Sequence, residues 1–143
     1  MYRLTIKRQR VNEPRRDYEG QQLSAPETVA AMALALLGDE DQEVFCAFFL
    51  DIKNRVAGYA EVARGSVDSC PVDPRMVFRA ALLAPGCASV ILCHNHPSGD
   101  PQPSAEDRGL TARLKNAGSM LGMPVLDHVI VGGAKHYSFA ERG

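Results

Sequence analysis

Two histidines one residue apart, followed by a carboxylate, are the residues of this sequence best suited to chemistry. His94 and His96 stand in the segment His-Asn-His-Pro-Ser-Gly, and Asp107 follows a short distance along the chain. Because side chains of an extended segment repeat with period two, the two histidines point the same way. A carboxylate from the next element completes three ligands of a tetrahedral zinc ion and leaves the fourth position open for water. The sequence therefore predicts a catalytic zinc site.

Each part of this pattern also has a purely structural interpretation. Ser104 and Asp107 have the spacing of a capping box, in which a serine and an acid satisfy the first backbone N–H groups of a helix. The two histidines could also simply belong to a polar loop at the end of a strand, which is a common arrangement. Their combination favours the metal, because a strand end, a Gly/Pro loop and a helix start converge where open α/β sheets hold their ligands.

The hydrophobic pattern predicts interleaved strands and helices around this site. Residues 44–50 and 56–63 are two apolar, β-rich runs joined by a turn, which predicts a hairpin. The other predicted strands span residues 88–93, 125–131 and 136–139, and the predicted helices begin at Ser24, Asp73 and Ser104. We therefore expect an α/β fold, with a mixed β-sheet flanked by helices.

The first forty residues are expected to form a strand, a loop and a helix that lead into the domain over residues 41–143, as one compact unit. Tyr2, Leu4 and Ile6 alternate with polar residues, as in an edge strand. The basic residues among the first sixteen are typical of a solvated face, with a nucleic-acid contact as the less favoured alternative. A capping box at Ser24 and Glu27 predicts a helix that ends at Gly38.

Composition and charge suggest no membrane or nucleic-acid partner. The net charge is −1 over 143 residues, and no apolar run approaches the ~20 residues of a membrane-spanning helix. The start has no signal-peptide core, so we expect a cytoplasmic protein. The cysteines include no C-x-x-C pair, which favours thiols over disulfides or a cysteine zinc site. They are Cys46, Cys70, Cys87 and Cys93.

The motif from His94 to Asp107 resembles the JAMM metallopeptidase signature of Jab/MPN domains. The longer phrases His-Asn-His-Pro-Ser-Gly-Asp-Pro, Pro-Arg-Met-Val-Phe-Arg from Pro74 and Leu-Asp-His-Val-Ile-Val from Leu126 resemble the bacterial RadC family. The resemblance covers residues 40–143 and implies the layered MPN fold, which is similar to that of cytidine deaminases. RadC proteins carry a helix-hairpin-helix segment ahead of this domain. Residues 1–40 contain no such motif, so the chain resembles a short, stand-alone member.

The resemblance also implies roles for individual residues. It implies zinc bound by His94, His96 and Asp107, with Ser104 helping to stabilise an oxyanion. JAMM enzymes take a general base from a glutamate on an upstream strand, and Glu61 is the candidate, if its strand lies beside the one that ends at His94. The alternative for Glu61 is a solvent-facing strand residue.

A second polar pair, Asp127 and His128, stands on an otherwise apolar predicted strand. Adjacent strand residues face opposite ways, so at most one of the two can face the site. That residue could orient a zinc-binding histidine, or it could be a hydrogen-bonded polar group of the core.

Two functions from different classes follow from these patterns. The first is a zinc-dependent hydrolase that cleaves a peptide or isopeptide bond of an unidentified protein substrate with zinc-activated water. The second is a non-catalytic RadC-like scaffold associated with DNA repair or mobile elements, in which nucleic acid is a partner. The complete set of three zinc ligands favours the hydrolase. The oligomeric state is left open, with a homodimer as one alternative.

Two superficial matches are excluded. HNH nucleases spread their motif over a longer unit, and the H-x-E and P-C-x-x-C signature of nucleoside deaminases is absent from the sequence.

Overall fold

The computed structural model describes residues 1–3, 5, 20–65 and 72–142. Leu4 and Ile6 of the predicted N-terminal strand lie outside these residues, as do Cys70 and most of the basic residues near the N-terminus. Within the described part of the chain, no helix combines the length and apolar character needed to cross a membrane.

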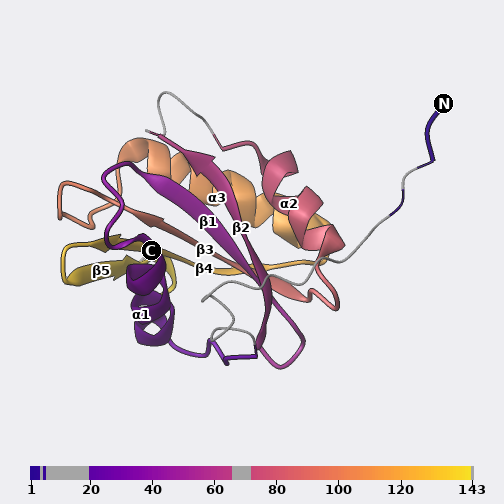
Figure 1. Ribbon diagram of the computed structural model, residues 1–143, viewed down its shortest axis with the longest axis horizontal. Coiled ribbons are helices and arrows are strands. Elements are labelled where there is room, and N and C mark those ends of the chain that lie inside the picture. The colour runs from indigo at the N-terminus through magenta and orange to yellow at the C-terminus, as the bar shows by residue number, and fades with distance from the viewer. Residues whose placement is uncertain (4, 6–19, 66–71, 143) are drawn as a thin grey trace.

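A five-stranded mixed sheet forms the centre of the molecule (Figure 1). Its strand order is β2-β1-β3-β4-β5, in which β3 and β4 are parallel and the other neighbours are antiparallel. The predicted α/β fold with a mixed sheet and a β1–β2 hairpin is confirmed. The strands are β1 (Val44–Leu50), β2 (Val56–Arg64), β3 (Ser89–Asn95), β4 (Val125–Gly132) and β5 (Lys135–Ser138).

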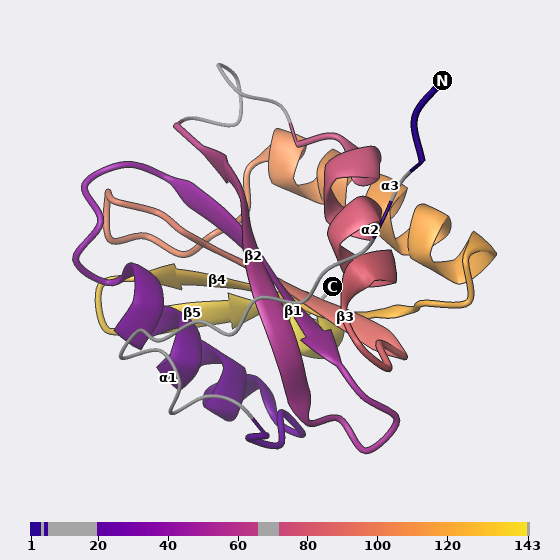
Figure 2. The ribbon, with the colours of Figure 1, turned by 45° about the vertical axis from the view of Figure 1, so that its right-hand side comes forward.

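Helices cover both faces of the sheet (Figure 2). Helix α1 (Pro26–Leu37) packs on one face, whereas α2 (Pro74–Leu83) and α3 (Ala105–Met120) pack on the other. The short α4 (Phe139–Arg142) follows β5, so the last strand ends one residue earlier than the sequence predicted.

The residues at which α1 and α2 begin are explained by a proline and by a capping side chain. The side chain of Asp73 accepts a hydrogen bond from the backbone N–H of Arg75 and caps α2. The capping box predicted at Ser24 is wrong, because Ala25 is the N-cap of α1 and no side chain caps this helix. The proline at the first turn provides the start instead, since its ring fixes a helical φ and it has no N–H to satisfy.

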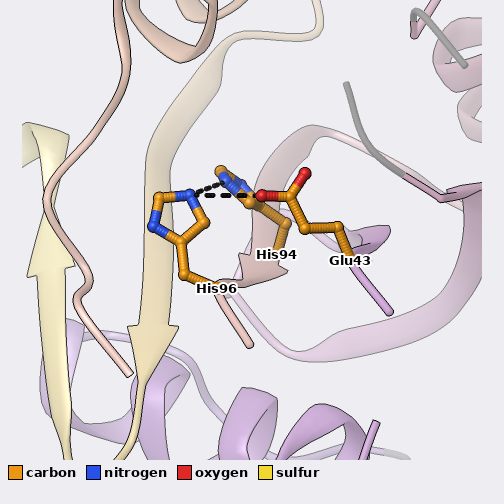
Figure 3. Close-up of side chains that lie close together, drawn as sticks. All are labelled: Glu43, His94 and His96. Atoms are coloured by element: carbon orange, nitrogen blue, oxygen red, sulfur yellow. Dashed lines mark hydrogen bonds and ion pairs between the residues drawn. The ribbon is translucent and has the colours of Figure 1, made fainter. Parts of the chain in front are cut away.

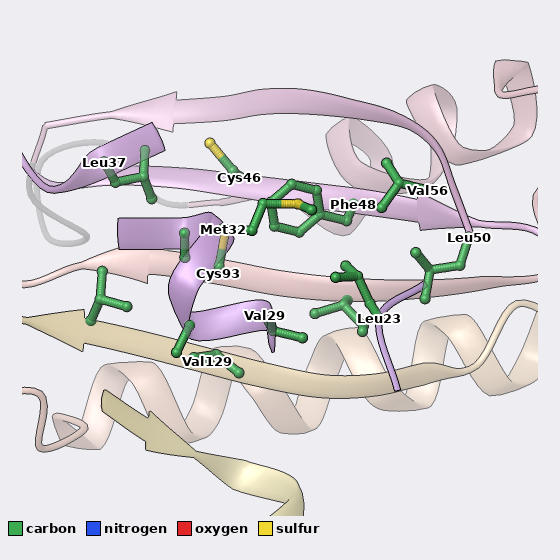
Figure 4. Packing of buried hydrophobic residues seen from close by; sticks show 14 of the residues in the cluster. Leu23, Val29, Met32, Leu37, Cys46, Phe48, Leu50, Val56, Cys93 and Val129 are labelled. Carbon is green, nitrogen blue, oxygen red and sulfur yellow. The ribbon is translucent and has the colours of Figure 1, made fainter. Parts of the chain in front are cut away.

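The core under α1 is built from alternate residues of the central strands (Figure 4). Phe48 and Leu50 of β1 pack with Val129 of β4 and with the apolar side of the helix. Cys46 and Cys93 are register partners on β1 and β3 and share this face. Both are buried, free thiols, as the sequence predicted, and Cys87 is a half-buried free thiol.

The opposite face carries the other half of the core and leads into the polar site. Leu92 and Phe45 lie there among residues that pack with α2 and α3. His94 is two residues beyond Leu92 and pairs with Phe45 in the register, so its side chain lies on the same face. The strand thus continues from a hydrophobic core directly into a histidine.

Gly132, at the end of β4, allows the β4–β5 turn to pack against the loop that follows the histidines. A Cβ atom placed on Gly132 would lie 2.9 Å from backbone atoms of Gly99, Asp100 and Pro101. That separation is too short for carbon atoms, so any larger residue must displace the loop.

We predict that Gly132→Ala destabilises the fold by about 1–3 kcal/mol, because the added methyl group overpacks this contact. Gly109→Ala is the matched control, since Gly109 lies within α3 and a Cβ atom added there would meet open space. The control should be up to about 1 kcal/mol more stable than the wild type, because alanine favours helices. Urea unfolding measures both, and equal stability of the two variants would contradict the proposed close packing.

Candidate metal centre

Three side-chain groups converge where β3 ends and α3 begins. Nε2 of His94 lies 3.0 Å from Nε2 of His96. Oδ2 of Asp107 lies 3.2 Å from Nε2 of His96, and its Oδ1 lies 3.3 Å from Nε2 of His94. Ligand atoms placed tetrahedrally about 2.0–2.1 Å from a zinc ion are roughly 3.3 Å apart. The three groups therefore have the chemistry and the spacing of a zinc ligand set.

The backbone explains why these groups meet. His94 is the penultimate residue of β3, and His96 immediately follows the strand, so their side chains share a face. The chain then turns at Gly99, whose φ of 89° favours glycine, and the N–H of Gly99 donates to the carbonyl of His96. The loop returns the chain to Ser104, where α3 starts and directs Asp107 at the histidines.

The capping box at Ser104 and Asp107 is present and coexists with the metal geometry. The hydroxyl of Ser104 accepts from the N–H of Asp107 at 3.1 Å, and Oδ2 of Asp107 accepts from the N–H of Ser104 at 2.9 Å. The cap fixes the carboxylate that faces the histidines. Burial raises the pKa of Asp107, but its contacts with the imidazoles of His94 and His96 outweigh this effect and hold the pKa well below its usual range.

A buried chain of hydrogen bonds selects the ring nitrogen that His94 offers to a metal. The hydroxyl of Thr111 donates to the carbonyl of Asp107 at 2.7 Å and lies 2.7 Å from Nδ1 of His128. Since the single hydroxyl proton is used, Nδ1 of His128 must be the donor to Thr111. Burial lowers the pKa of His128, so its ring is neutral and its Nε2 is an acceptor.

Nδ1 of His94 lies 2.7 Å from that acceptor and therefore donates to it. The remaining ring nitrogen of a neutral His94, Nε2, then presents a lone pair to the site. His128 is thus the member of the Asp127–His128 pair that faces the site, whereas Asp127 accepts hydrogen bonds from Ser138 and Ala140.

His96 has a corresponding arrangement on the loop. Its Nδ1 donates to the carbonyl of Asp100 at 2.8 Å, so Nε2 of the neutral ring also presents a lone pair. The hydrogen bond from His96 to Asp107 raises the pKa of His96. Two nitrogen lone pairs and a carboxylate in contact require either a proton or a cation between them, which is the condition for pH-dependent metal binding.

Glu43, which the sequence patterns did not single out, reaches the same place from the residue before β1 (Figure 3). Its Oε1 lies 3.7 Å from Nε2 of His96, and ligand atoms of Glu43, His94 and His96 all lie within 4.8 Å of one another. A signal for it exists in the sequence: if residues 44–50 pair antiparallel with the strand that ends at His94, the residue before Val44 lies beside His96.

The structure does not bring Glu61 to the site, and the placement predicted for it is wrong. Glu61 pairs with Cys46 in the register, and Cys46 pairs with Cys93, so Glu61 is on the face opposite His94. It is exposed and forms an ion pair with Arg64, with Nε and Oε1 2.6 Å apart. The error came from the strand order, because β1 lies between β2 and β3 instead of at their side.

Comparison with known proteins agrees with this architecture. A family model described as RadC-like JAB domain matches residues 23–143. A UPF0758 protein of Salinibacter ruber is 45% identical over 94% of this chain and 57% of its own length. A UPF0758 protein of Clostridium beijerinckii is 40% identical over 85% of this chain and 52% of its own length. The chain thus spans about half the length of these curated relatives.

We predict that one zinc ion binds per chain and that its affinity falls as the pH falls through the raised pKa of His96. Protonated His96 cannot offer its Nε2 lone pair, so binding near that pH releases a proton, whereas the neutral His128 releases none. Calorimetric titration in two buffers of different ionisation enthalpy measures both effects. An affinity that stays constant as the pH is lowered to the ordinary histidine pKa of about 6.5 would contradict this assignment.

In the metal-free protein, lowering the pH has the opposite effect on His96: its protonation then increases the stability of the fold. Because the folded pKa of His96 is raised, its pairing with Asp107 stabilises the fold below the ordinary histidine pKa and is lost as the pH rises through the folded value.

We predict that Thr111→Val, which keeps the shape of the side chain, costs about 1–3 kcal/mol of stability, since it leaves the buried Nδ1–H of His128 without an acceptor. Zinc affinity should fall about 10–100-fold, as for other groups that orient metal ligands. Thr111→Ser retains the hydroxyl and should keep most of both properties. The role of the hydrogen-bond chain would be refuted if the Val and Ser variants bound zinc equally well.

Proposed function

This chain belongs to the RadC-like JAB domain family, and from that fold and its polar site we propose that it is a zinc-dependent hydrolase that cleaves a peptide or isopeptide bond. One observation carries the proposal: Nε2 of His94, Nε2 of His96 and the Asp107 carboxylate form a ligand triangle with Glu43 beside it. Three protein ligands and a neighbouring carboxylate are the components of a catalytic zinc site.

The residues present fit zinc by their donor atoms as well as by their spacing. Two imidazole nitrogens and one carboxylate match zinc's preference for nitrogen and oxygen ligands. Cys93 is adjacent to His94 in sequence but belongs to the other face of the sheet, so its thiol does not join the ligand set. When bound, zinc lowers the pKa of a coordinated water towards ~7 and polarises the carbonyl of the bond to be cleaved.

Glu43 is proposed as the general base in place of Glu61. Its carboxylate is half-buried beside His96 and can accept a proton from the attacking water. The water oxygen forms the new bond to the carbonyl carbon, the carbon–nitrogen bond breaks, and Glu43 returns the proton to the leaving amine. It therefore ends the cycle in its starting form.

Ser104 is proposed to donate a hydrogen bond to the oxyanion that develops on the carbonyl oxygen. Its oxygen already accepts the capping N–H of Asp107, which leaves the hydroxyl proton as a donor. The residue is exposed at the start of α3, where a substrate could reach it.

We predict that Glu43→Gln lowers hydrolysis by about 10²–10⁴-fold while the protein still takes up one zinc, because the lost group moves a proton and is not a ligand. Glu61→Gln is the matched control and should retain wild-type turnover. A panel of fluorogenic peptides and lysine-linked isopeptides, assayed with zinc and with a chelator, provides the measurement.

Two outcomes of that assay would contradict the proposal. Loss of turnover in Glu61→Gln with retention in Glu43→Gln would reverse the assignment of the base. A zinc-loaded wild type that is inert towards the whole panel would favour the non-catalytic scaffold.

A further inference from the structure

Asn95, the residue between the two histidines, faces away from them and contacts the segment that carries Glu43. It is 4% exposed. Its Oδ1 accepts a hydrogen bond from the N–H of Val44 at 2.7 Å, and its Nδ2 donates to the carbonyl of Gln42 at 2.8 Å. The carboxamide thus binds the main chain immediately before and immediately after Glu43.

These two hydrogen bonds stand where the β1–β3 ladder stops. The backbone register of the two strands ends with Phe45 opposite His94. One residue further, the N–H of Val44 donates to the side chain of Asn95 instead of to a backbone carbonyl of β3. The chain ahead of β1 can therefore leave the line of the strand while its backbone polar groups remain paired.

The same segment is also held from the other side. The N–H of Gly65 donates to the carbonyl of Glu43 at 2.8 Å, and Arg64 forms an ion pair with Glu40 at 2.7 Å. The arginine pair is partly exposed and contributes little by itself. The carboxamide of Asn95 is the stronger constraint, because its hydrogen bonds with Val44 and Gln42 are short and the one from Val44 is buried. Its Nδ2 also lies 3.5 Å from the carbonyl of Glu40, a third and longer contact with the same segment.

We propose that Asn95 is a positioning residue that fixes the Glu43 carboxylate beside His96, so that His94, Asn95 and His96 act as one unit. The two histidines face the metal site, and the asparagine between them, directed to the other side by strand alternation, holds the base. This inference rests on the role proposed above for Glu43.

The chemistry of the side chain explains why asparagine suits this position. A carboxamide has one acceptor and a donor group on the same planar unit, which matches the N–H of Val44 and the carbonyl of Gln42. Aspartate keeps the acceptor but places a negative oxygen against the Gln42 carbonyl. Alanine loses all of these hydrogen bonds, including those with the N–H of Val44 and the carbonyl of Gln42.

The first test measures amide hydrogen exchange by NMR in the metal-free protein. In Asn95→Ala the N–H of Val44 should exchange at least about tenfold faster than in the wild type, since its acceptor is gone. In Asn95→Asp the acceptor remains, and Val44 should stay protected. Ser138→Ala, which removes a buried hydrogen bond to Asp127 elsewhere in the sheet, is the control and should leave Val44 unchanged. Equal exchange of Val44 in the wild type and in Asn95→Ala would overturn the proposal.

The second test measures zinc affinity, by competition with a chelator, in a double-mutant cycle of Asn95→Ala and Glu43→Gln. If Asn95 acts through the Glu43 charge, each single substitution lowers the affinity by up to about tenfold, and the double variant is no weaker than Glu43→Gln alone. Additive losses would overturn the positioning role, because they would mean that Asn95 acts on the site independently of Glu43.

Two alternative results are provided for: a variant that does not fold, and a wild type that binds no zinc. If Asn95→Ala does not fold, Asn95→Ser replaces it in the cycle, because its side chain is neutral and too short to bridge the main chain on both sides of Glu43. If the wild type binds no zinc, the proposed function fails, whereas the exchange of Val44 still decides whether Asn95 holds the segment around Glu43.

Discussion

The antiparallel pairing of β1 with β3 is the constraint on which the site depends. Its register sets Phe45 opposite His94 and Cys46 opposite Cys93, and so decides which face of the sheet carries the histidine. A shift of one residue would turn every side chain of the strand to the other face. The same pairing places Glu43, one residue ahead of β1, beside His96. The hydrophobic cores on the two faces stabilise this register, because each strand contributes buried side chains to both.

Within the site, hydrogen bonds and ring packing fix the orientation of the histidine side chains. Each histidine is bonded through Nδ1, one to His128 and the other to the Asp100 carbonyl, so both present Nε2 to the same point. The rings are also packed: Phe45 stacks on His94 with ring centroids 5.6 Å apart, and Phe139 stacks on His128 at 5.1 Å. The two histidines are therefore held in place by groups outside the proposed ligand set, as expected for residues that orient metal ligands.

Local sequence patterns predicted the elements well, because they depend on periodicity and on capping. The strand over residues 44–50 and the capped start of α3 at Ser104 agree with the structure. The grouping of His94, His96 and Asp107 was also predictable, since the three stand close in sequence on either side of one loop. Glu43 was missed and Glu61 was wrongly placed at the site because the positions of both depend on strand order, which no local pattern contains. Likewise, the contacts of Asn95 join residues more than fifty positions apart.

We propose that His94, His96 and Asp107 are the metal ligands and that Glu43 stands outside the ligand set. A crystal structure of the zinc-loaded protein, with the ion located by anomalous scattering, would identify the ligands. We expect one zinc about 2.0–2.2 Å from Nε2 of both histidines and from an Asp107 oxygen, with Glu43 beyond ligand distance. A zinc ion bound by Glu43 in place of Asp107, or bound by a cysteine, would contradict it.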